Sequence, residues 1–187
     1  MKTSITRSLW LALAVAGSAA AQTPPPAKPL GSMPDAAQFP KVEFVWEERV
    51  TLSPAVVLGK TAIGQRQYIP ITGGTIDGPK FKGKVVPGGW DFQLQTASGC
   101  GSLSADYFIQ HDDGTLVHVL NESMSCRPGA DGARGFTRAK LEAPEGAHGW
   151  LTSGVFLTSI ELDAGPPSAD GKPAPLGAIR IKFYQVK

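Results

Sequence analysis

Asp91 is the residue of this sequence best suited to chemistry. It follows Pro87-Gly88-Gly89-Trp90, where a turn enters an apolar segment, and the neighbouring Trp90 and Phe92 would exclude water and raise its pKa. A carboxyl group with a raised pKa can serve as a general acid or base. The competing interpretation is a carboxylate that caps the backbone amides of the turn. We predict a catalytic role for Asp91.

Arg138 and His118 are further candidates. Arg138 follows Gly135-Phe136-Thr137 in a predicted strand, and its guanidinium could anchor a carboxylate, a phenolate or Asp91 itself. The alternative for Arg138 is a surface or structural ion pair. His118 lies in an apolar stretch, where it would be a proton shuttle in a barrel lumen or a satisfied core histidine. We predict Arg138 as a catalytic anchor and His118 as a ligand-binding residue.

Three aromatic residues, Trp90, Tyr107 and Trp150, would line either a packed core or a cavity for an aromatic or apolar molecule. We predict them as ligand-binding residues. His111 and His148 lack the regular spacing of a metal triad, so we predict no metal, and no motif for a cofactor stands out. The glycine pairs precede no helix and carry no phosphate-loop motif, which favours turns.

Short strands must position these residues. Near the start of the folded region, Val42, Phe44 and Trp46 alternate with Glu43, Val45 and Glu47, and the same period of two recurs from Ile179 to Tyr184. Between them we predict strands over Arg66–Ile71, Lys80–Val86, Trp90–Thr96, Ser104–His111, Leu116–Glu122, Gly135–Glu142 and Trp150–Leu162. The Asp113-Gly114 turn predicts that two of these strands, Ser104–His111 and Leu116–Glu122, form a hairpin.

The pattern of strands predicts an all-β fold. About nine or ten strands joined by turns are typical of a meander that forms a barrel or a sandwich. We favour a single small antiparallel β-barrel, a calycin-like meander, because closure removes exposed edge strands. Asp163–Gly177 is rich in Pro and Gly and predicts a long loop, either decoration or a lid.

The N-terminus predicts export. Residues 1–21 combine Lys2 and Arg7, an apolar run and Ala19-Ala20-Ala21, the pattern of a cleaved bacterial signal peptide. Its apolar run, about 10 residues, is too short to span a membrane, which takes about 20. We therefore expect mature protein that begins at Gln22, is periplasmic or secreted, and has no integral membrane segment. Residues 22–40 predict a disordered Pro-rich linker before a domain over 41–187.

Cysteine content and charge narrow the function further. In an oxidising compartment the only two cysteines, Cys100 and Cys126, predict a disulfide bond, with two buried thiols as the alternative. The chain has 187 residues with 18 basic and 16 acidic side chains. Lys2 and Arg7 lie in the predicted signal peptide, so the mature chain has 18 − 2 = 16 basic residues against 16 acidic ones. A neutral chain without a basic run argues against a nucleic-acid partner.

The sequence resembles a known family. Gly64–Pro79 reads GQRQYIPITGGTIDGP and Phe81–Asp91 reads FKGKVVPGGWD. These segments are similar to the DUF3237 (UPF0311) family, and the resemblance extends from about Val42 to Lys187. It implies a compact β-barrel-like domain and favours a functional Asp91. Thr152 stands where members commonly carry Asn, and we include it among the ligand-binding residues. Asp106 stands where members commonly carry Arg.

Three functions are consistent with these features. We expect an exported β-barrel protein that binds a small apolar or aromatic molecule in its barrel mouth, anchored by Asp91 and Arg138. The first alternative is an isomerase, cyclase or lyase in which Asp91 transfers protons and Arg138 stabilises an oxyanion or carboxylate. The second is a cell-envelope interaction module. The sequence leaves open whether the protein is an enzyme, and it leaves the oligomeric state open.

Overall fold

A computed structural model describes residues 39–126, 135–163 and 177–187. The predicted signal peptide over 1–21 and nearly all of the predicted linker over 22–40 lie outside these residues, and so does most of the predicted loop Asp163–Gly177. Among the described residues no helix is long and apolar enough to cross a membrane.

The described chain consists of antiparallel strands and one short helical turn, α1 (Trp150–Ser153). The strands are β1 (Val42–Leu52), β2 (Val56–Thr61), β3 (Gly64–Asp77), β4 (Gly83–Val85), β5 (Trp90–Gln95), β6 (Gly101–His111), β7 (Leu116–Ser125), β8 (Gly135–Glu142), β9 (Val155–Leu162) and β10 (Ala178–Val186).

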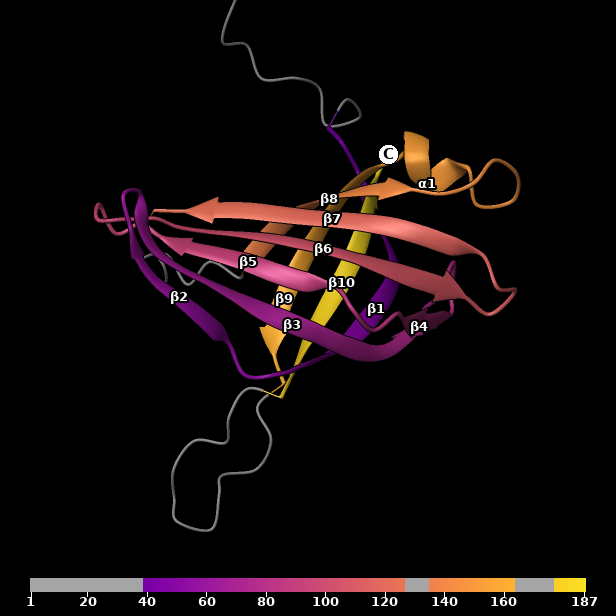
Figure 1. Cartoon of the computed structure of the whole chain (residues 1–187). Helices are drawn as coiled ribbons and strands as arrows, with labels where there is room; N and C mark the ends of the chain where they lie inside the picture. Colours follow the sequence, from indigo (N-terminus) through magenta and orange to yellow (C-terminus); the bar gives the residue numbers. More distant parts are fainter. Residues whose placement is uncertain (1–38, 127–134, 164–176) are drawn as a thin grey trace, which may run out of the picture. The chain divides into compact units, whose positions relative to one another are not determined.

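The strands close into a barrel (Figure 1). Their order is β1-β10-β9-β8-β7-β6-β4-β3, and β1 also pairs with β3, which joins the two ends of the sheet. Strands β4 and β5 share one position, since both lie between β3 and β6 and pair with different parts of each. The wall therefore has eight strand positions, which confirms the predicted small antiparallel barrel.

Most predicted strands match observed ones. The predicted hairpin is confirmed as β6 and β7, joined by a turn in which Gly114 alone has a positive φ, +92°. Two details of the prediction were wrong. Strand β2 was not expected. It pairs with β3 next to the part of β3 that pairs with β1. The predicted strand Trp150–Leu162 begins instead with α1, since a helical turn over Trp150–Ser153 precedes β9.

A β-bulge in β1 changes which residues face the core. The register with β10 shifts between Phe44 and Trp46, so that Val45 and Trp46 are both buried whereas Phe44 is exposed. A bulge inserts one extra residue and ends the simple alternation. The predicted face of Val42, Phe44 and Trp46 is therefore wrong for its first two residues, and beyond the bulge Glu48 lies on the buried face.

The barrel interior is apolar at one end and polar at the other. The apolar end holds aromatic rings in contact, where Trp46 packs against Phe81 in a tilted arrangement and stacks on Phe183, at centroid distances of 5.1 and 4.6 Å. The polar end lies where β5 ends and β6 begins, and its inward side chains are partly exposed. The inward-facing residues of the polar end include Gln67, Gln93, Leu103 and Ser123.

The Cys100–Cys126 disulfide is confirmed. It joins the start of β6 to the end of β7 at the polar end, where the two strands already pair through Gly101 and Ser125. The bond closes a segment with a sequence separation of 26 residues. The disulfide therefore restrains the β6–β7 pair. These two strands also form part of the wall of the candidate functional site.

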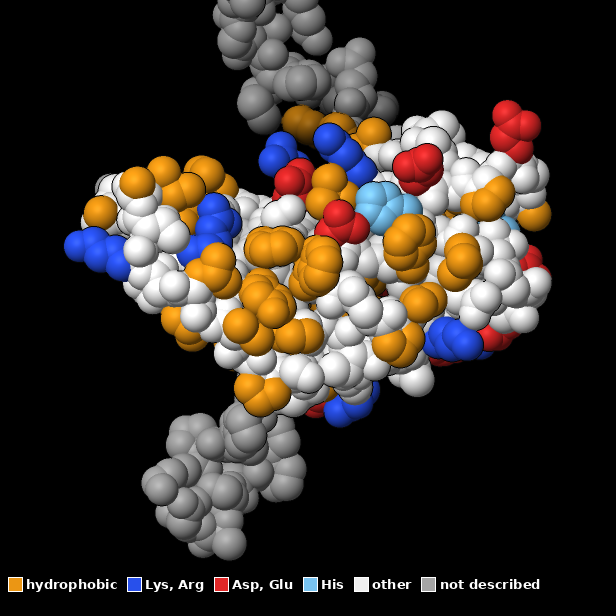
Figure 2. All heavy atoms as spheres, in the orientation of Figure 1, with side chains coloured by type: hydrophobic (Ala, Val, Ile, Leu, Met, Phe, Trp, Pro, Cys, Tyr) orange, Lys and Arg blue, Asp and Glu red, His pale blue; other side chains and the backbone are white. Residues whose placement is uncertain are grey.

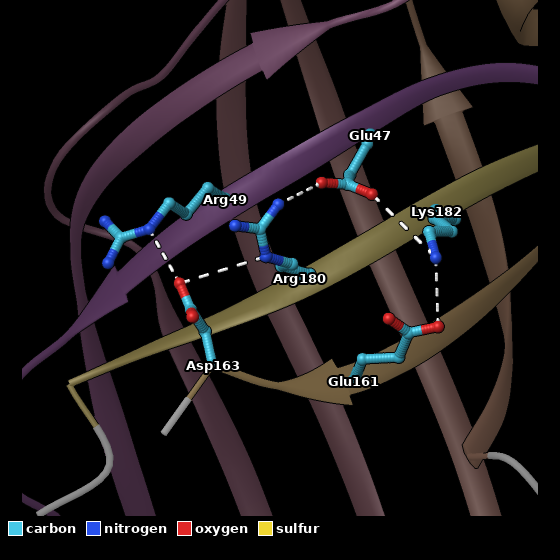
Figure 3. A network of polar contacts seen from close by, with 6 residues as sticks. All are labelled: Glu47, Arg49, Glu161, Asp163, Arg180 and Lys182. Carbon is cyan, nitrogen blue, oxygen red and sulfur yellow. Dashed lines mark hydrogen bonds and ion pairs between the residues drawn. The ribbon is translucent and has the colours of Figure 1, made fainter. Parts of the chain in front are cut away.

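The outer wall of β1, β10 and β9 carries a network of charges (Figure 3). Arg180 donates to Glu47 at 2.7 Å, and Arg49 donates to Asp163 at 2.7 Å. Lys182 contacts Glu161 at 3.0 Å and Glu47 at 4.0 Å, so it joins Glu161 to the same group of charges. These exposed pairs support the register of the strands, each with a small effect.

The outer wall also has an apolar region. Figure 2 shows hydrophobic side chains gathered over β3, β5 and β6. The exposed aromatic residues of these strands include Trp90, Phe92 and Phe108, which are 47%, 37% and 49% exposed. Trp90 and Phe92 contact each other at a centroid distance of 5.7 Å.

Candidate functional site

Asp91 faces the barrel interior. It pairs with Ala105 on β6, which pairs with Asn121 on β7, and both of these residues are buried. Directly opposed residues share a face of the sheet, so Asp91 shares the inner face. The turn before it is compact because Gly88 has φ +110° and a Cβ at Gly89 would overlap that of Tyr107. The glycine pair thus brings Asp91 close to Tyr107.

A second carboxyl group, that of Glu48, lies fully buried inside the barrel. The indole Nε1–H of Trp46 donates to its Oε1 at 3.0 Å, and the Tyr107 hydroxyl donates to its Oε2 at 2.8 Å. Glu48 and Trp46 come from β1, whereas Tyr107 comes from β6. Each Glu48 oxygen therefore has one donor, and no cation pairs with it among the hydrogen bonds of the described residues.

Burial changes the acidity of all three titratable groups in this interior. It raises the pKa of Glu48 from 4.5 to about 7, although the hydrogen bonds from Trp46 and Tyr107 favour the carboxylate. Burial also raises the pKa of Asp91, opposed by hydrogen bonds from Gln93 and the Ser104 backbone. Burial, and then the charges of Glu48 and Asp91, keep the pKa of Tyr107 well above 10. Near neutral pH, Glu48 can therefore hold or release a proton while Tyr107 stays protonated.

Asp91 keeps one oxygen available. Gln93 donates to its Oδ2 at 2.7 Å, and Gln67 donates to the Oε1 of Gln93 at 2.8 Å. Its Oδ1 is buried and has no hydrogen-bond partner among the described residues. A buried, unpaired carboxylate oxygen is unfavourable, and such an atom is found where a ligand or water binds. We call Glu48, Asp91, Tyr107 and Trp46 the interior carboxyl site.

Further polar groups extend this interior across β7, β8 and β9. Asn121, Thr137 and Thr158 are buried and hydrogen-bonded to one another. Gln185 of β10 is largely buried, and its Oε1 lacks a hydrogen-bond partner among the described residues. The inner wall therefore carries neutral donors and acceptors in addition to the two carboxyl groups.

The structure does not bring Arg138 to Asp91. Arg138 is exposed on the outer wall, because its neighbours Thr137 and Ala139 occupy the inner face of β8. Trp90 and Phe92 also point outward, opposite to Asp91, so burial inside the barrel and not these two rings raises the Asp91 pKa. The expectation that Arg138 and Trp90 converge on Asp91 is wrong, since adjacent residues of a strand alternate between faces.

His118 is likewise on the outer wall, where its Nε2 lies 2.7 Å from Asp106 Oδ1. The face that it shares with Leu116 and Leu120 is the outer one, and the buried residues of β7 are Val117, Val119 and Asn121. The histidine therefore neither belongs to the core nor faces the lumen. It lines an outer groove along β7, β8 and β9.

Trp150 and Thr152 lie at the apolar end, and neither contacts Glu48 or Asp91 among the contacts of the described residues. Trp150 packs against Phe156 with a centroid distance of 5.9 Å, and the Thr152 hydroxyl donates to the Ala143 carbonyl and accepts from its N–H. Thr152 thus holds the loop before α1, and it also lines the groove that His118 and Arg138 line. Of the predicted ligand-binding residues, only Tyr107 joins Asp91.

His111, Asp113 and His148 come together at the apolar end. The His111 Nδ1 and His148 Nε2 lie 3.0 and 2.9 Å from the two oxygens of Asp113. The hydrogen bond from His148, followed by those from Thr115, lowers the pKa of Asp113. The positions of the two histidines in the sequence lack the regular spacing of a metal triad, but the fold places the centroids of the two rings 4.4 Å apart.

Sequence analysis missed Glu48, although a signal was present. Trp46, Glu48 and Val50 stand two residues apart, so the period of two places Glu48 on the face of two apolar residues. A carboxyl group on such a face is rare unless it is paired or functional. Gln67 and Gln93 gave no such signal, because both lie in segments whose flanking residues are mixed.

The fold and this interior define a class of protein: a small closed antiparallel barrel with two protonatable carboxyl groups on its inner wall. The chain belongs to the DUF3237 family, described as a protein of unknown function, whose model matches residues 40–186.

Similar proteins occur in bacteria and in a fungus. A UPF0311 protein of Clostridium acetobutylicum is 38% identical over 87 residues, which are 46% of this chain and 55% of that protein. The hydroalkoxylation enzyme phnH of Penicillium herquei is 33% identical over 94 residues, 50% of this chain and 60% of the enzyme. In both cases the matched region spans less than two thirds of the relative.

Solved structures share the fold. A β-barrel-like protein from Acinetobacter baumannii superposes with a TM-score of 0.66 at 24% sequence identity, covering 79% of this chain and 96% of that chain. At this identity the likeness shows the fold alone, and it agrees with the barrel described above.

Proposed function

We propose that the protein binds a small, largely apolar or aromatic molecule inside the polar end of its barrel and catalyses a proton-transfer reaction of the isomerase, cyclase or lyase type. The observation that carries the proposal is the buried Glu48, whose pKa of about 7 lets it exchange a proton near neutral pH. Binding without turnover is the simpler form of the same proposal.

Three residues of the interior carboxyl site have a role in this reaction. Glu48 in its protonated form donates a proton to the substrate. Asp91 accepts one through its unpaired Oδ1. Tyr107, bonded to Glu48 and close to Asp91, is a positioning residue that holds the donor carboxyl group in place. Two carboxyl groups of different burial provide the acid and base that such reactions need.

The name of the Penicillium herquei relative supports a specific reaction type. Hydroalkoxylation adds an O–H group across a carbon–carbon double bond, and the intramolecular reaction forms a cyclic ether. In this reaction, Asp91 would accept the hydroxyl proton, the C–O bond would form, and Glu48 would give its proton to the other alkene carbon. The product is an isomer of the substrate, so no oxidant, reductant or cofactor is consumed.

A panel of ortho-alkenyl phenols and their saturated analogues tests this proposal. Native mass spectrometry measures binding, and product analysis after reaction in D₂O measures turnover. We expect the alkenyl phenols to give an isomeric ether with one carbon-bound deuterium, and the saturated phenols only to bind. Glu48→Gln should bind but not react. Glu47→Gln, which alters the outward-facing neighbour, is the matched control and should react like the wild type.

Two outcomes would contradict the proposal. If Glu48→Gln and Asp91→Asn both react at the wild-type rate, the interior carboxyl site is not catalytic. If no phenol of the panel binds at all, while the protein is folded, the substrate class is wrong.

We also propose that the protein is exported. The support is the charged start, short apolar run and small-residue cleavage pattern of residues 1–21, together with the Cys100–Cys126 disulfide, which suits an oxidising compartment. N-terminal sequencing of the protein from a periplasmic or culture fraction should begin at Gln22 or within about two residues of it. Protein that keeps Met1 in these fractions would overturn the proposal.

A further inference from the structure

We propose that His111, Asp113 and His148 bind a divalent transition-metal ion such as Zn²⁺ at the apolar end of the barrel. His111 ends β6, Asp113 lies in the β6–β7 turn, and His148 lies in the loop before α1, on the right of Figure 1. Their ligand atoms all lie within 4.8 Å of one another. This site is separate from the interior carboxyl site, so either proposal can fail without the other.

The distances suit a metal of this kind. Zn²⁺ bonds to imidazole nitrogen and carboxylate oxygen at about 2.0 to 2.2 Å, so tetrahedral ligand atoms lie about 3.3 Å apart. The Asp113 oxygens lie 3.0 Å from His111 Nδ1 and 2.9 Å from His148 Nε2. Small side-chain adjustments would therefore place the three ligand atoms around one ion.

Neighbouring groups already orient the ligands. The Asp113 backbone N–H donates to His111 Nδ1 at 3.2 Å, so this nitrogen is an unprotonated acceptor there, and a bound ion would replace this hydrogen bond at its lone pair. The Thr115 N–H donates to Asp113 Oδ1 at 2.9 Å. Phe81 contacts both imidazole rings edge-on, at centroid distances of 4.9 and 5.8 Å. Oriented ligands over an apolar base are features of metal sites.

The chemistry of the three side chains favours a borderline metal. Two imidazoles and one carboxylate suit Zn²⁺ and the other late first-row transition-metal ions better than Ca²⁺ or Mg²⁺, which prefer oxygen ligands. Asp113 is 47% exposed while His111 and His148 are 24% and 12% exposed. The open side lies at Asp113, where water can supply a fourth ligand. A bound ion would join the β6–β7 turn to the loop before α1.

The test uses tag-free protein that has been treated with EDTA and dialysed into metal-free buffer. Titration calorimetry with ZnCl₂ measures stoichiometry and affinity, and the visible spectrum of added Co²⁺ reports the ligand set. The variants are His148→Ala, which removes a loop ligand, and Asp113→Asn, which keeps the shape. The matched control is His118→Ala, which removes another histidine paired with an aspartate on the outer wall.

We expect one Zn²⁺ per chain for the wild type and the control, and affinity reduced by more than about tenfold in the other two variants. Zn²⁺ should also raise the melting temperature of the wild type and the control only. Less than stoichiometric binding by the wild type, or wild-type affinity in either His148→Ala or Asp113→Asn, would overturn the proposal. If the wild type binds no Zn²⁺ and these variants have lower melting temperatures, the cluster stabilises the fold through hydrogen bonds alone and the proposal is overturned.

Discussion

Replacing Glu48 by glutamine should change how stability depends on pH. The carboxyl group of Glu48 has a pKa of about 7 in the folded protein, against an ordinary value of 4.5 for an exposed glutamate. Between these values the folded protein holds a proton that the unfolded chain has released. Raising the pH through this range therefore favours unfolding, and the wild type loses stability from about pH 4.5 to about pH 7.

The size of the effect follows from the two pKa values. They differ by 7 − 4.5, or about 2.5, and each unit of pKa corresponds to about 1.4 kcal/mol, so the effect is between about 3 and 4 kcal/mol. Glu48 is fully buried, so solvent screening does not reduce this value much. The Glu48→Gln side chain stays neutral and can still accept from Trp46 or Tyr107, and we expect it to cost about 1 kcal/mol or less at pH 5.

Urea unfolding of wild type and variant measures the difference, with the disulfide intact and EDTA present. At pH 5 the two free energies of unfolding should agree to within about 1 kcal/mol, and at pH 8 the variant should be more stable by about 2 to 3 kcal/mol. Glu47→Gln, the control on the outer wall, should follow the wild type. Parallel curves for the wild type and Glu48→Gln from pH 5 to pH 8 would refute the reasoning.

Three further predictions concern other parts of the barrel. Asp91→Asn should keep or raise the free energy of unfolding at neutral pH, because it removes a partly desolvated charge; a loss of about 1 kcal/mol in urea unfolding would instead indicate a turn cap. Replacing Cys100 and Cys126 by serine should lower that free energy by about 3.5 kcal/mol in the chain-entropy treatment of the closed segment, measured against the oxidised wild type. Arg180→Gln should lower the melting temperature slightly at low salt, and the difference should vanish at high salt if Arg180 acts through Glu47 and its neighbours.

Much of the fold could be predicted from local patterns. The alternation from Ile179 to Phe183 appears in β10 as expected, and the Asp113-Gly114 turn joins two paired strands. These features were accessible because they depend on residues close together in the chain. The β-bulge in β1 was not, since the placement of Val45 and Trp46 depends on how β1 pairs with β10.

The site was predicted only in part. Asp91 and Tyr107 do meet inside the barrel, but Arg138 and Trp90 face outward. Alternation within a strand already implies that Trp90 and Asp91 lie on opposite faces. It does not say which face is the inner one, because Trp90 and Phe92 make the outer face of β5 more apolar than the inner face.

The sequence by itself determined the period of its strands, the hairpin turn, the cysteine pair and membership of a β-barrel family. Each of these depends on residue types at short spacing or on a sequence motif. Only the tertiary structure decided that Tyr107 hydrogen-bonds to Glu48 and that His148 contacts Asp113. These contacts join residues 59 and 35 positions apart. Barrel closure and strand register, which depend on all the strands together, bring them within hydrogen-bond distance.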